Sequence, residues 1–284
     1  SNDSIFRKLI MPIKAKTSDH RQSFNNLHVW SRGSQRAPNK PLLALYVIGK
    51  YRNGHSRLIR FAEMYKDLTK LLVEFGPNRK SYHAEYPFWY LRNDGIWEVS
   101  SSSPMAPRKL KNDQPSKNTL IKSDARGGFP EPLFRALNRD PQLSLDIAQD
   151  ILNSHFPESI HNEILTAIGI QSGFGQSKKS DGRNPAFRPA VLMAYNYKCA
   201  VCGFNARLGD ASIGLEAAHI MWHQAQGPGT TDNGMALCSL HHQVFDRGVF
   251  TLTSDYRIEI SQLLSGGKTT NRWLSNYHGK QIYK

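Results

Sequence analysis

Two short motifs in the last third of the chain each place two zinc-binding side chains three residues apart. Cys199 and Cys202 form the first motif, and Cys238 and His241 form the second. Together the motifs use all three cysteines of the chain. A structural zinc ion takes four thiolate or imidazole ligands in a tetrahedron, so each motif would supply two of them. We therefore predict a structural Zn²⁺ with no position left open for a reacting water; the alternative is a set of buried free thiols.

Further polar residues lie between and after these motifs. The segment 216–220 reads EAAHI, the segment 232–234 reads DNG, and the segment 238–248 reads CSLHHQVFDRG. In residue type, order and rough spacing, these segments and the zinc motifs resemble the HNH endonucleases, which share a ββα-metal fold. The resemblance covers about residues 184–261 and implies hydrolysis of a phosphodiester bond.

The resemblance implies a role for four residues. His219, at the end of an expected strand, would be the general base, because a neutral imidazole suits that task near neutral pH. Asn233 would orient His219 and brace the intervening loop. His242, on a helix after the second zinc motif, would bind the catalytic Mg²⁺ or Mn²⁺. Asp246 lies four residues further on the same helix face and would be a second ligand. Phosphodiester hydrolysis needs a base for the attacking water and a cation for the charge that grows on the phosphoryl and leaving oxygens, and these residues would supply both.

The sequence departs from the HNH pattern at one position. Many of these enzymes have an Asp or His as a metal ligand immediately before the general base, whereas this chain has Ala218 there. Glu216 could take that place, because residues two apart on a regular strand point to the same face.

Composition and charge limit the class of partner. The 284 residues include 37 Lys and Arg against 23 Asp and Glu, a net charge of +14. Residues 1–100 hold 17 of the basic and 8 of the acidic side chains. Such a surface favours a polyanion, most commonly nucleic acid, although the charge could serve solubility alone.

Membrane insertion and secretion are not expected. The longest apolar run, Pro41–Gly49, is too short to cross a bilayer. No apolar signal segment is visible, and an odd number of cysteines predicts a reduced compartment. With the family resemblance, this indicates the bacterial cytoplasm.

Periodicity and turn residues predict a mainly helical first part. The Asn93-Asp94-Gly95 turn between short apolar runs predicts a hairpin over Leu91–Val99. The Ser, Pro and Lys content of Ser100–Ser123 predicts a loop. Apolar spacing and Pro positions predict helices over Lys40–Tyr51, Ile59–Phe75, Pro132–Leu137, Pro141–Asn153, Pro157–Ile168 and Phe187–Tyr197.

Two domains are expected, because residues 169–185 are rich in Gly and polar side chains and read as a linker. The expected order is a flexible tail over residues 1–24, a first domain over 25–168, this linker, and an HNH domain over 186–284.

Motifs in the first domain indicate what it binds. They are APNKPLLAL at 37–45, EFGP at 74–77, EYPFWYL at 85–91 and DGIWEV at 94–99. These stretches resemble the sulfur-binding domain of restriction endonucleases that cut phosphorothioate-modified DNA. In that family the sulfur-binding domain precedes an HNH domain, which is the order found here.

A phosphorothioate carries a sulfur atom that is larger, more polarisable and less tightly hydrated than the oxygen it replaces. A shallow apolar pocket accepts this sulfur at small desolvation cost and penalises oxygen. Tyr86, Pro87 and Tyr90 are the candidates for such a pocket, whereas Phe88, Trp89 and Trp97 are expected in the core. Flanking phosphates and bases need basic and polar groups. The candidates are Arg32, Arg36, Asn39, Lys40, Arg79 and Lys80.

The sequence thus predicts an α+β protein with a mainly helical sulfur-binding domain, a small β hairpin and a zinc-supported ββα-metal domain. Its expected function is restriction of double-stranded DNA that carries Rp phosphorothioate linkages. A double-strand break would need a homodimer or two binding events, because one HNH site cuts one strand. The alternatives are an HNH enzyme specific for methylated cytosine, whose aromatics would stack on a flipped base, and a zinc-containing DNA-binding protein without nuclease activity.

Overall fold

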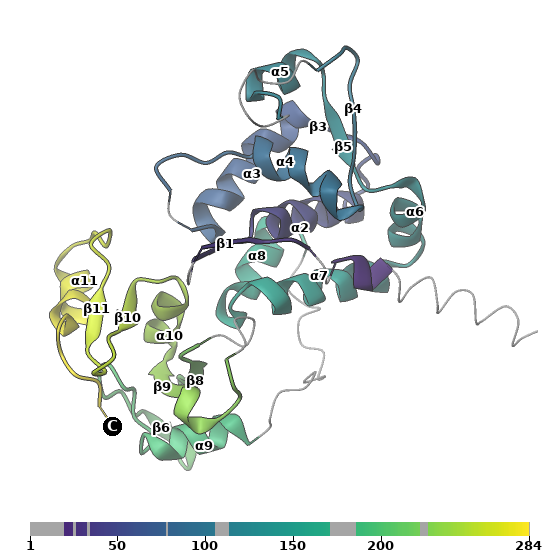
Figure 1. Cartoon of the computed structure of the whole chain (residues 1–284). Helices are drawn as coiled ribbons and strands as arrows, with labels where there is room; N and C mark the ends of the chain where they lie inside the picture. Colours follow the sequence, from purple (N-terminus) through teal and green to yellow (C-terminus); the bar gives the residue numbers. More distant parts are fainter. Residues whose placement is uncertain are drawn as a thin grey trace, which may run out of the picture. The chain divides into compact units, whose positions relative to one another are not determined.

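The computed structural model describes residues 20–24, 27–32, 35–77, 79–105, 114–170, 186–221 and 227–283. Of residues 30–32 and 35–36 it describes only the backbone. The chain divides after Gln176 into two compact units, and each has its own hydrophobic core. Figure 1 shows the helices and strands of both units.

The core of the first unit is built around helix α2, Asn39–Arg52. Pro41 lies in its first turn, where a missing backbone N–H costs nothing. Leu42, Leu43 and Leu45 have no exposed surface, and α2 packs against α3, α4, α6 and α7. The helix expected over Lys40–Tyr51 therefore exists, but it is buried on nearly every side rather than along one face.

The other helices of the first unit surround α2 (Figure 1). Helix α7 begins after Asp140, whose side chain accepts hydrogen bonds from the backbone N–H groups of Gln142 and Leu143, an N-cap. The helices expected over Pro132–Leu137 and Pro141–Asn153 are confirmed. The helix expected over Pro157–Ile168 is instead a 3-10 helix over Glu158–Ile160 followed by an α-helix over His161–Ala167. The elements are α3 (Phe61–Phe75), α4 (Glu85–Tyr90), η1 (Leu91–Asp94), α5 (Lys117–Lys122), α6 (Glu131–Arg139), α7 (Pro141–His155), η2 (Glu158–Ile160) and α8 (His161–Ala167).

Two small antiparallel sheets complete the first unit. Strands β1 (Trp30–Arg32) and β2 (Gln35–Ala37) form a hairpin. Strands β3 (Ile59–Arg60), β5 (Arg126–Gly128) and β4 (Glu98–Ser100) form a sheet in the order β3-β5-β4. Gly127 is required in the central strand, because a Cβ there would lie 2.4 Å from the Trp97 ring.

Three local expectations for this unit are wrong. Leu91–Val99 is not a hairpin: a short 3-10 helix ends at Gly95, where φ is +72°, and β4 pairs with the distant β5. The loop expected over Ser100–Ser123 contains α5, which Ser116 caps by accepting a hydrogen bond from Thr119 N. The helix expected from Ile59 begins at Phe61, because the two preceding residues pair with β5.

The second unit has a ββα arrangement at its centre. Strands β8 (Leu215–His219) and β9 (Gly234–Cys238) pair antiparallel without a bulge, with Leu215 opposite Cys238 and His219 opposite Gly234. Helix α10 (Ser239–Asp246) follows β9 directly, and α9 (Phe187–Ala194) packs on both strands. The smaller elements are β6 (Arg207–Leu208), β7 (Ala211–Ser212), η4 (Thr231–Asn233), β10 (Phe250–Leu252), β11 (Ile258–Ile260), α11 (Lys268–Trp273) and η5 (Ser275–Tyr277).

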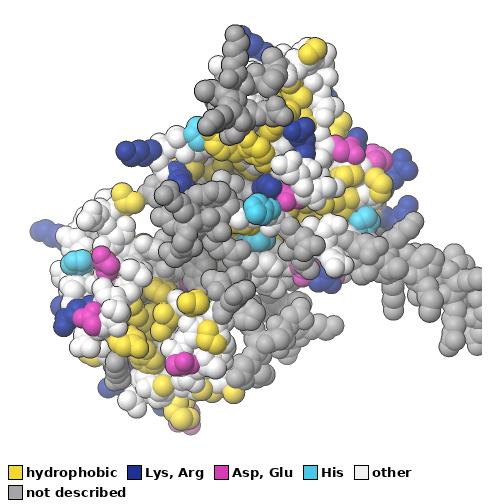
Figure 2. Space-filling view, viewed as in Figure 1, with side chains coloured by type: hydrophobic (Ala, Val, Ile, Leu, Met, Phe, Trp, Pro, Cys, Tyr) yellow, Lys and Arg dark blue, Asp and Glu magenta, His cyan; other side chains and the backbone are white. Residues whose placement is uncertain are grey.

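The fold is thus α+β in both units. In the described parts of the chain, no helix has the length and apolar character needed to cross a membrane. On the face shown in Figure 2, Lys and Arg side chains form several small separate groups rather than one continuous basic patch.

Candidate functional site

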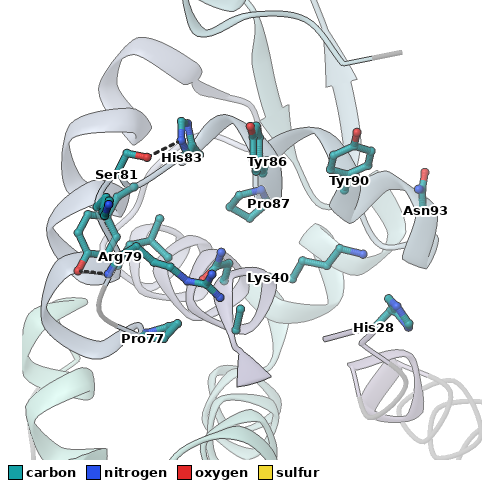
Figure 3. A pocket seen from close by; sticks show the side chains of 15 residues that line it. His28, Lys40, Pro77, Arg79, Ser81, His83, Tyr86, Pro87, Tyr90 and Asn93 are labelled. Atoms are coloured by element: carbon teal, nitrogen blue, oxygen red, sulfur yellow. Dashed lines mark hydrogen bonds between the residues drawn. The ribbon is translucent and has the colours of Figure 1, made fainter. Parts of the chain in front are cut away.

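A pocket of about 610 Å³ opens in the first unit beside α2 and α4 (Figure 3). Seven of the nine residues expected to bind sulfur or DNA line it. They are Asn39, Lys40, Arg79, Lys80, Tyr86, Pro87 and Tyr90. The other two, Arg32 and Arg36, lie in β1 and β2, and their side chains are outside the described part of the structure. The remaining lining residues are His28, Ala37, Leu72, Pro77, Ser81, Tyr82, His83 and Asn93.

Helix α4 forms the apolar side of the pocket. Tyr86, Pro87 and Tyr90 come from one side of this helix, across the pocket from Lys40 and Arg79 (Figure 3). Tyr86 is 38% exposed, whereas Pro87 is buried and Tyr90 half-buried. The other side of α4 carries Phe88 and Trp89, which are buried in the core together with Trp97, as predicted. The pocket therefore combines an apolar wall with basic groups.

An ion pair anchors the basic side of the pocket. Lys40 Nζ lies 2.5 Å from Asp94 Oδ2, and the two side chains are 14% and 7% exposed. Asp94 Oδ1 also accepts a hydrogen bond of 3.2 Å from the backbone N–H of His28. Asp94 was not among the sequence candidates, although it belongs to the DGIWEV motif.

His83 forms a second anchored group at the pocket, and sequence reasoning missed it. Its ring stacks on Tyr86 with 4.8 Å between centroids and 11° between planes. Its Nε2 lies 2.9 Å from Ser81 Oγ, and its Nδ1 lies 3.0 Å from Glu85 Oε1. The Glu85 side chain is 5% exposed. The HAEY sequence at 83–86 carries no recognisable chemical motif, so only the fold reveals this contact.

The four predicted zinc ligands come together in the second unit. Their ligand atoms all lie within 4.8 Å of one another. His241 Nδ1 is 3.1 Å from Cys238 Sγ and 3.6 Å from Cys199 Sγ, and Cys202 Sγ is 4.0 Å from Cys238 Sγ. The first knuckle closes at Gly203, where φ is +72°.

The surroundings of this cluster suit a metal. His241 Nε2 donates a hydrogen bond of 2.9 Å to the Trp273 carbonyl, which turns Nδ1 towards the thiols. Hydrogen bonds within the group lower the pKa of the Cys199 thiol, with the largest contribution from Cys202. Burial opposes charging of His241, but its hydrogen bonds with Cys199 and Cys238 outweigh burial and raise its pKa to about 10. The donor set, three sulfurs and one nitrogen, is one that zinc prefers.

The predicted general base His219 ends β8 and stacks on Phe187 of α9. The ring centroids are 4.1 Å apart, and the planes differ by 7°. Gly234 lies directly opposite His219, and a Cβ there would be 3.2 Å from the Phe187 ring and 2.2 Å from Val191 Cγ2. The glycine therefore leaves the space in which α9 approaches the end of β8.

Asn233 is 8% exposed and holds both ends of the loop before it. Its side chain accepts a hydrogen bond from Met221 N at 2.8 Å and donates to the carbonyls of Met221 and Pro228. Its own carbonyl accepts from the backbone N–H of Ile220, the residue after His219. These hydrogen bonds join Asn233 to Ile220 and Met221 on one side of the loop and to Pro228 on the other.

His242 lies on α10 between two carboxylates. Its Nδ1 is 2.5 Å from Glu216 Oε2, and its Nε2 is 3.4 Å from Asp246 Oδ2. Ser239 Oγ donates a second hydrogen bond of 2.7 Å to Glu216 Oε1. The hydrogen bond from His242 holds the pKa of Glu216 below its usual range. Because β8 is regular, Glu216 reaches α10 on the side where Ala218 also points.

Comparison with known proteins gives the family. Residues 17–173 match the family described as the ScoMcrA-like DNA sulfur-binding domain, and residues 199–253 match an HNH endonuclease family. Comparison with curated protein sequences found no match.

Solved structures that are similar to part of this chain include two sulfur-binding domains complexed with phosphorothioated DNA. That of ScoMcrA is 19% identical and covers 53% of this chain and 94% of its own, with a TM-score of 0.46. That of SprMcrA is 19% identical and covers 54% and 94%, with a TM-score of 0.47. The Type IV phosphorothioation-dependent restriction endonuclease ScoMcrA is 20% identical, with a TM-score of 0.45; the match covers 53% of this chain and 32% of that protein. Because the first family match spans more than half of the sequence, the chain belongs to the ScoMcrA-like DNA sulfur-binding family, and its second unit makes it an HNH DNA endonuclease.

Proposed function

We propose that this protein is a restriction endonuclease that recognises an Rp phosphorothioate linkage in double-stranded DNA and cleaves the DNA nearby. The observation that carries the proposal is that seven of the predicted residues, from three separate stretches of the sequence, line one pocket. The related domains of ScoMcrA and SprMcrA were solved with phosphorothioated DNA, which supports the same ligand class here.

In this proposal the apolar side of the pocket receives the sulfur atom. The rings of Tyr86, Pro87 and Tyr90 contact sulfur at little desolvation cost, whereas an oxygen in the same place loses hydrogen bonds to water. Lys40 and Arg79, across the pocket, contact phosphate oxygens. Lys80, Asn39, Arg32 and Arg36 are proposed to contact flanking phosphates or bases.

The proposed nuclease centre uses the groups at the ends of β8 and in α10. Neutral His219 takes a proton from the attacking water, and Asn233 keeps the loop next to His219 in place. His242 Nε2 and Asp246 Oδ2, separated by 3.4 Å, fit as two ligands of one divalent cation, Mg²⁺ or Mn²⁺. Such a cation would stabilise the negative charge that develops on the phosphoryl oxygens.

Glu216 has an orienting role in this arrangement. It contacts Nδ1 of His242, the nitrogen on the other side of the ring from Asp246. A carboxylate that accepts from one imidazole nitrogen fixes the ring and directs the other nitrogen to a metal. We therefore assign Glu216 to the orientation of His242 rather than to the ligand position that Ala218 leaves empty. Two protein ligands suffice for Mg²⁺, which usually keeps several waters.

The remaining proposals concern organisation. Cys199, Cys202, Cys238 and His241 would hold a structural Zn²⁺ that keeps β9 and α10 joined to the first knuckle. Phe24 and Ile170, expected in the tail over 1–24 and in the linker over 169–185, are buried in the core of the first unit. The sulfur-binding domain therefore includes both residues, and a linker between Ile170 and the nuclease domain over 186–284 would let cleavage occur at a distance from the modified linkage. A double-strand break requires two nuclease sites, hence a homodimer or two bound chains.

The test is a binding measurement on the full chain with His219→Ala to prevent cleavage. Matched duplexes carry one Rp phosphorothioate, one Sp phosphorothioate or no modification, in several flanking sequences at fixed salt. We expect tighter binding of the Rp duplex, and loss of that preference in Tyr86→Ala and Pro87→Ala. Equal affinity for all three duplexes in every sequence would refute sulfur recognition, and methylated duplexes in the same assay would identify the alternative ligand.

A further inference from the structure

We propose that His83 is a positioning residue of the pocket, and that it holds the ring of Tyr86 at the angle needed for contact with sulfur. The inference rests on the proposed function, in which Tyr86 contacts the phosphorothioate. It adds a residue outside the contact surface predicted from the sequence and gives that residue a mechanical role.

The first observation is the contact between the two rings. They are nearly parallel, with 11° between planes and 4.8 Å between centroids. Tyr86 is 38% exposed at the pocket, so one face of its ring is open to solvent or ligand. A side chain with that exposure keeps rotational freedom unless a neighbour restricts it. His83 provides that neighbour, on the same side of the pocket (Figure 3).

The second observation is that His83 is itself fixed at both ring nitrogens. Nδ1 pairs with Glu85 Oε1 at 3.0 Å, and Nε2 pairs with Ser81 Oγ at 2.9 Å. A carboxylate only accepts, so Nδ1 carries the proton of that hydrogen bond. The Ser81 hydroxyl can donate to Nε2 or accept from it, and both arrangements keep the ring in the same plane.

The third observation is the burial of Glu85. Its side chain is 5% exposed, and its Oε2 has no hydrogen-bond partner among the described residues. A buried carboxylate that has one hydrogen-bonded partner cannot exchange it for water, so the pair with His83 is costly to break. Glu85 also directly precedes Tyr86 in α4, so the anchor and the ring that it controls belong to one helix.

The buried carboxylate of Glu85 thus fixes the imidazole of His83, and the imidazole in turn restricts the exposed ring of Tyr86. Preorganisation of this kind improves discrimination between ligands of nearly equal shape, because the protein does not reorganise on binding. Sulfur and oxygen in one phosphate differ mainly in size and hydration. The contact of His83 with Tyr86 should therefore change the ratio between the affinity for phosphorothioated DNA and the affinity for unmodified DNA. Basic groups such as Arg79 and Lys80 set the affinity common to both duplexes.

The test compares two double variants that share the same change at the anchor. His83→Phe with Glu85→Gln keeps an aromatic ring against Tyr86, and His83→Ala with Glu85→Gln removes it. Glu85→Gln alone is the reference for both. Dissociation constants are measured for Rp-phosphorothioate and unmodified duplexes with the full chain in the His219→Ala background, and thermal unfolding reports whether each variant folds. His83→Phe and His83→Ala alone make the same comparison should the Gln variants not fold.

We expect the phenylalanine variant to keep most of the preference for sulfur, because the ring contact with Tyr86 remains although the hydrogen bonds that fix the ring are lost. In the alanine variant the ratio of the two affinities should fall about three- to tenfold, which corresponds to the loss of one aromatic contact. A full preference in the alanine variant would overturn the inference. Equal weakening on both duplexes in both variants would also overturn it, because His83 would then be a phosphate contact. If the wild-type protein binds the two duplexes equally well, the proposed function itself is refuted. The titration of the wild type shows this independently of the variants.

Discussion

Lys40 and Asp94 form a largely buried ion pair at the pocket, with 2.5 Å between Nζ and Oδ2. The same carboxylate accepts a hydrogen bond from the backbone of His28. One acidic side chain therefore fixes a cation of the pocket and the segment that leads into β1. It also compensates the charge of Lys40, so the apolar wall of the pocket faces a cation that is already paired.

Replacement of this carboxylate should change how the protein binds DNA in general. With Asp94→Asn we expect tighter binding of unmodified DNA and a smaller preference for the phosphorothioate, because Lys40 becomes an unpaired and less fixed cation. The dependence of log affinity on log salt should steepen by about 0.9, because the phosphate contact of Lys40 would then carry one more uncompensated positive charge. Salt titrations with both duplexes measure this. Asp255→Asn, which removes an exposed partner of Arg257 in the other unit, is the control. An unchanged salt slope would contradict the expectation.

Loss of one zinc ligand should unfold the second unit while the first unit keeps binding DNA. We expect Cys238→Ser to abolish cleavage and to lower the zinc content of the purified protein, because structural zinc sites contribute directly to folding. Elemental analysis measures the metal, and calorimetry follows unfolding. Treatment of the wild type with a chelator should have the same effect, reversed by Zn²⁺. Retention of full cleavage after complete removal of zinc would exclude this role.

Removal of the charge next to His242 should slow cleavage without weakening DNA binding. In Glu216→Gln the imidazole loses the carboxylate that fixes its orientation, so we expect a fall of about 10- to 100-fold in the cleavage rate. Single-turnover cleavage at saturating protein separates the rate from affinity. Glu259→Gln, a change on β11, is a matched control. A wild-type rate in Glu216→Gln would show that His242 does not depend on this contact.

The pH dependence of stability should report the same interaction. The hydrogen bond from His242 lowers the pKa of Glu216, so the folded state favours the ionised carboxylate. The resulting stabilisation is present above the pKa of Glu216 in the unfolded chain, and it is lost as the pH falls through the lowered pKa of the folded protein. The difference in melting temperature between wild type and Glu216→Gln should therefore shrink on acidification below the ordinary range of a glutamate. An increase of this difference in melting temperature on acidification would contradict the expectation.

The absence of a side chain at Gly234 should be essential for the stacking of Phe187 on His219. A Cβ at Gly234 would lie 2.2 Å from Val191 Cγ2 and 3.2 Å from the Phe187 ring. We expect Gly234→Ala to destabilise the protein by about 1–3 kcal/mol, the usual cost of overpacking, and to lower the cleavage rate as Phe187 shifts. Gly229→Ala is the matched control, because a Cβ there would meet nothing within 4 Å. Equal melting temperatures and rates for the two variants would contradict this view.

Local patterns carried most of what the sequence predicted. The two ligands of each zinc motif are three residues apart, and Tyr86, Pro87 and Tyr90 share one short helix, so spacing alone was informative. Contacts between distant segments were not predictable in this way. Strand β4 pairs with β5, which lies far along the chain, and this pairing replaces the expected hairpin after Leu91.

The same limit explains two contacts that were not predicted, since Asp94 was not among the site candidates and Glu216 was expected only as a metal ligand. Asp94 meets Lys40 across 54 positions of sequence, and Glu216 meets His242 across 26. A single sequence contains no signal for either pair. The role of His83 depends on the burial of Glu85, and burial of a glutamate is the opposite of what its polarity predicts.

The unbroken pairing of β8 with β9 also limits how this nuclease can change in length. Glu216 contacts His242 of α10, and His219, three positions later, stacks on Phe187 of α9. Because side chains alternate along a strand, deletion or insertion of one residue between them would turn one of the two side chains to the opposite face of β8. Side chains in β8 can be exchanged one at a time, but the number of residues between Glu216 and His219 has to stay fixed. Changes in chain length that preserve the nuclease should therefore occur outside this strand.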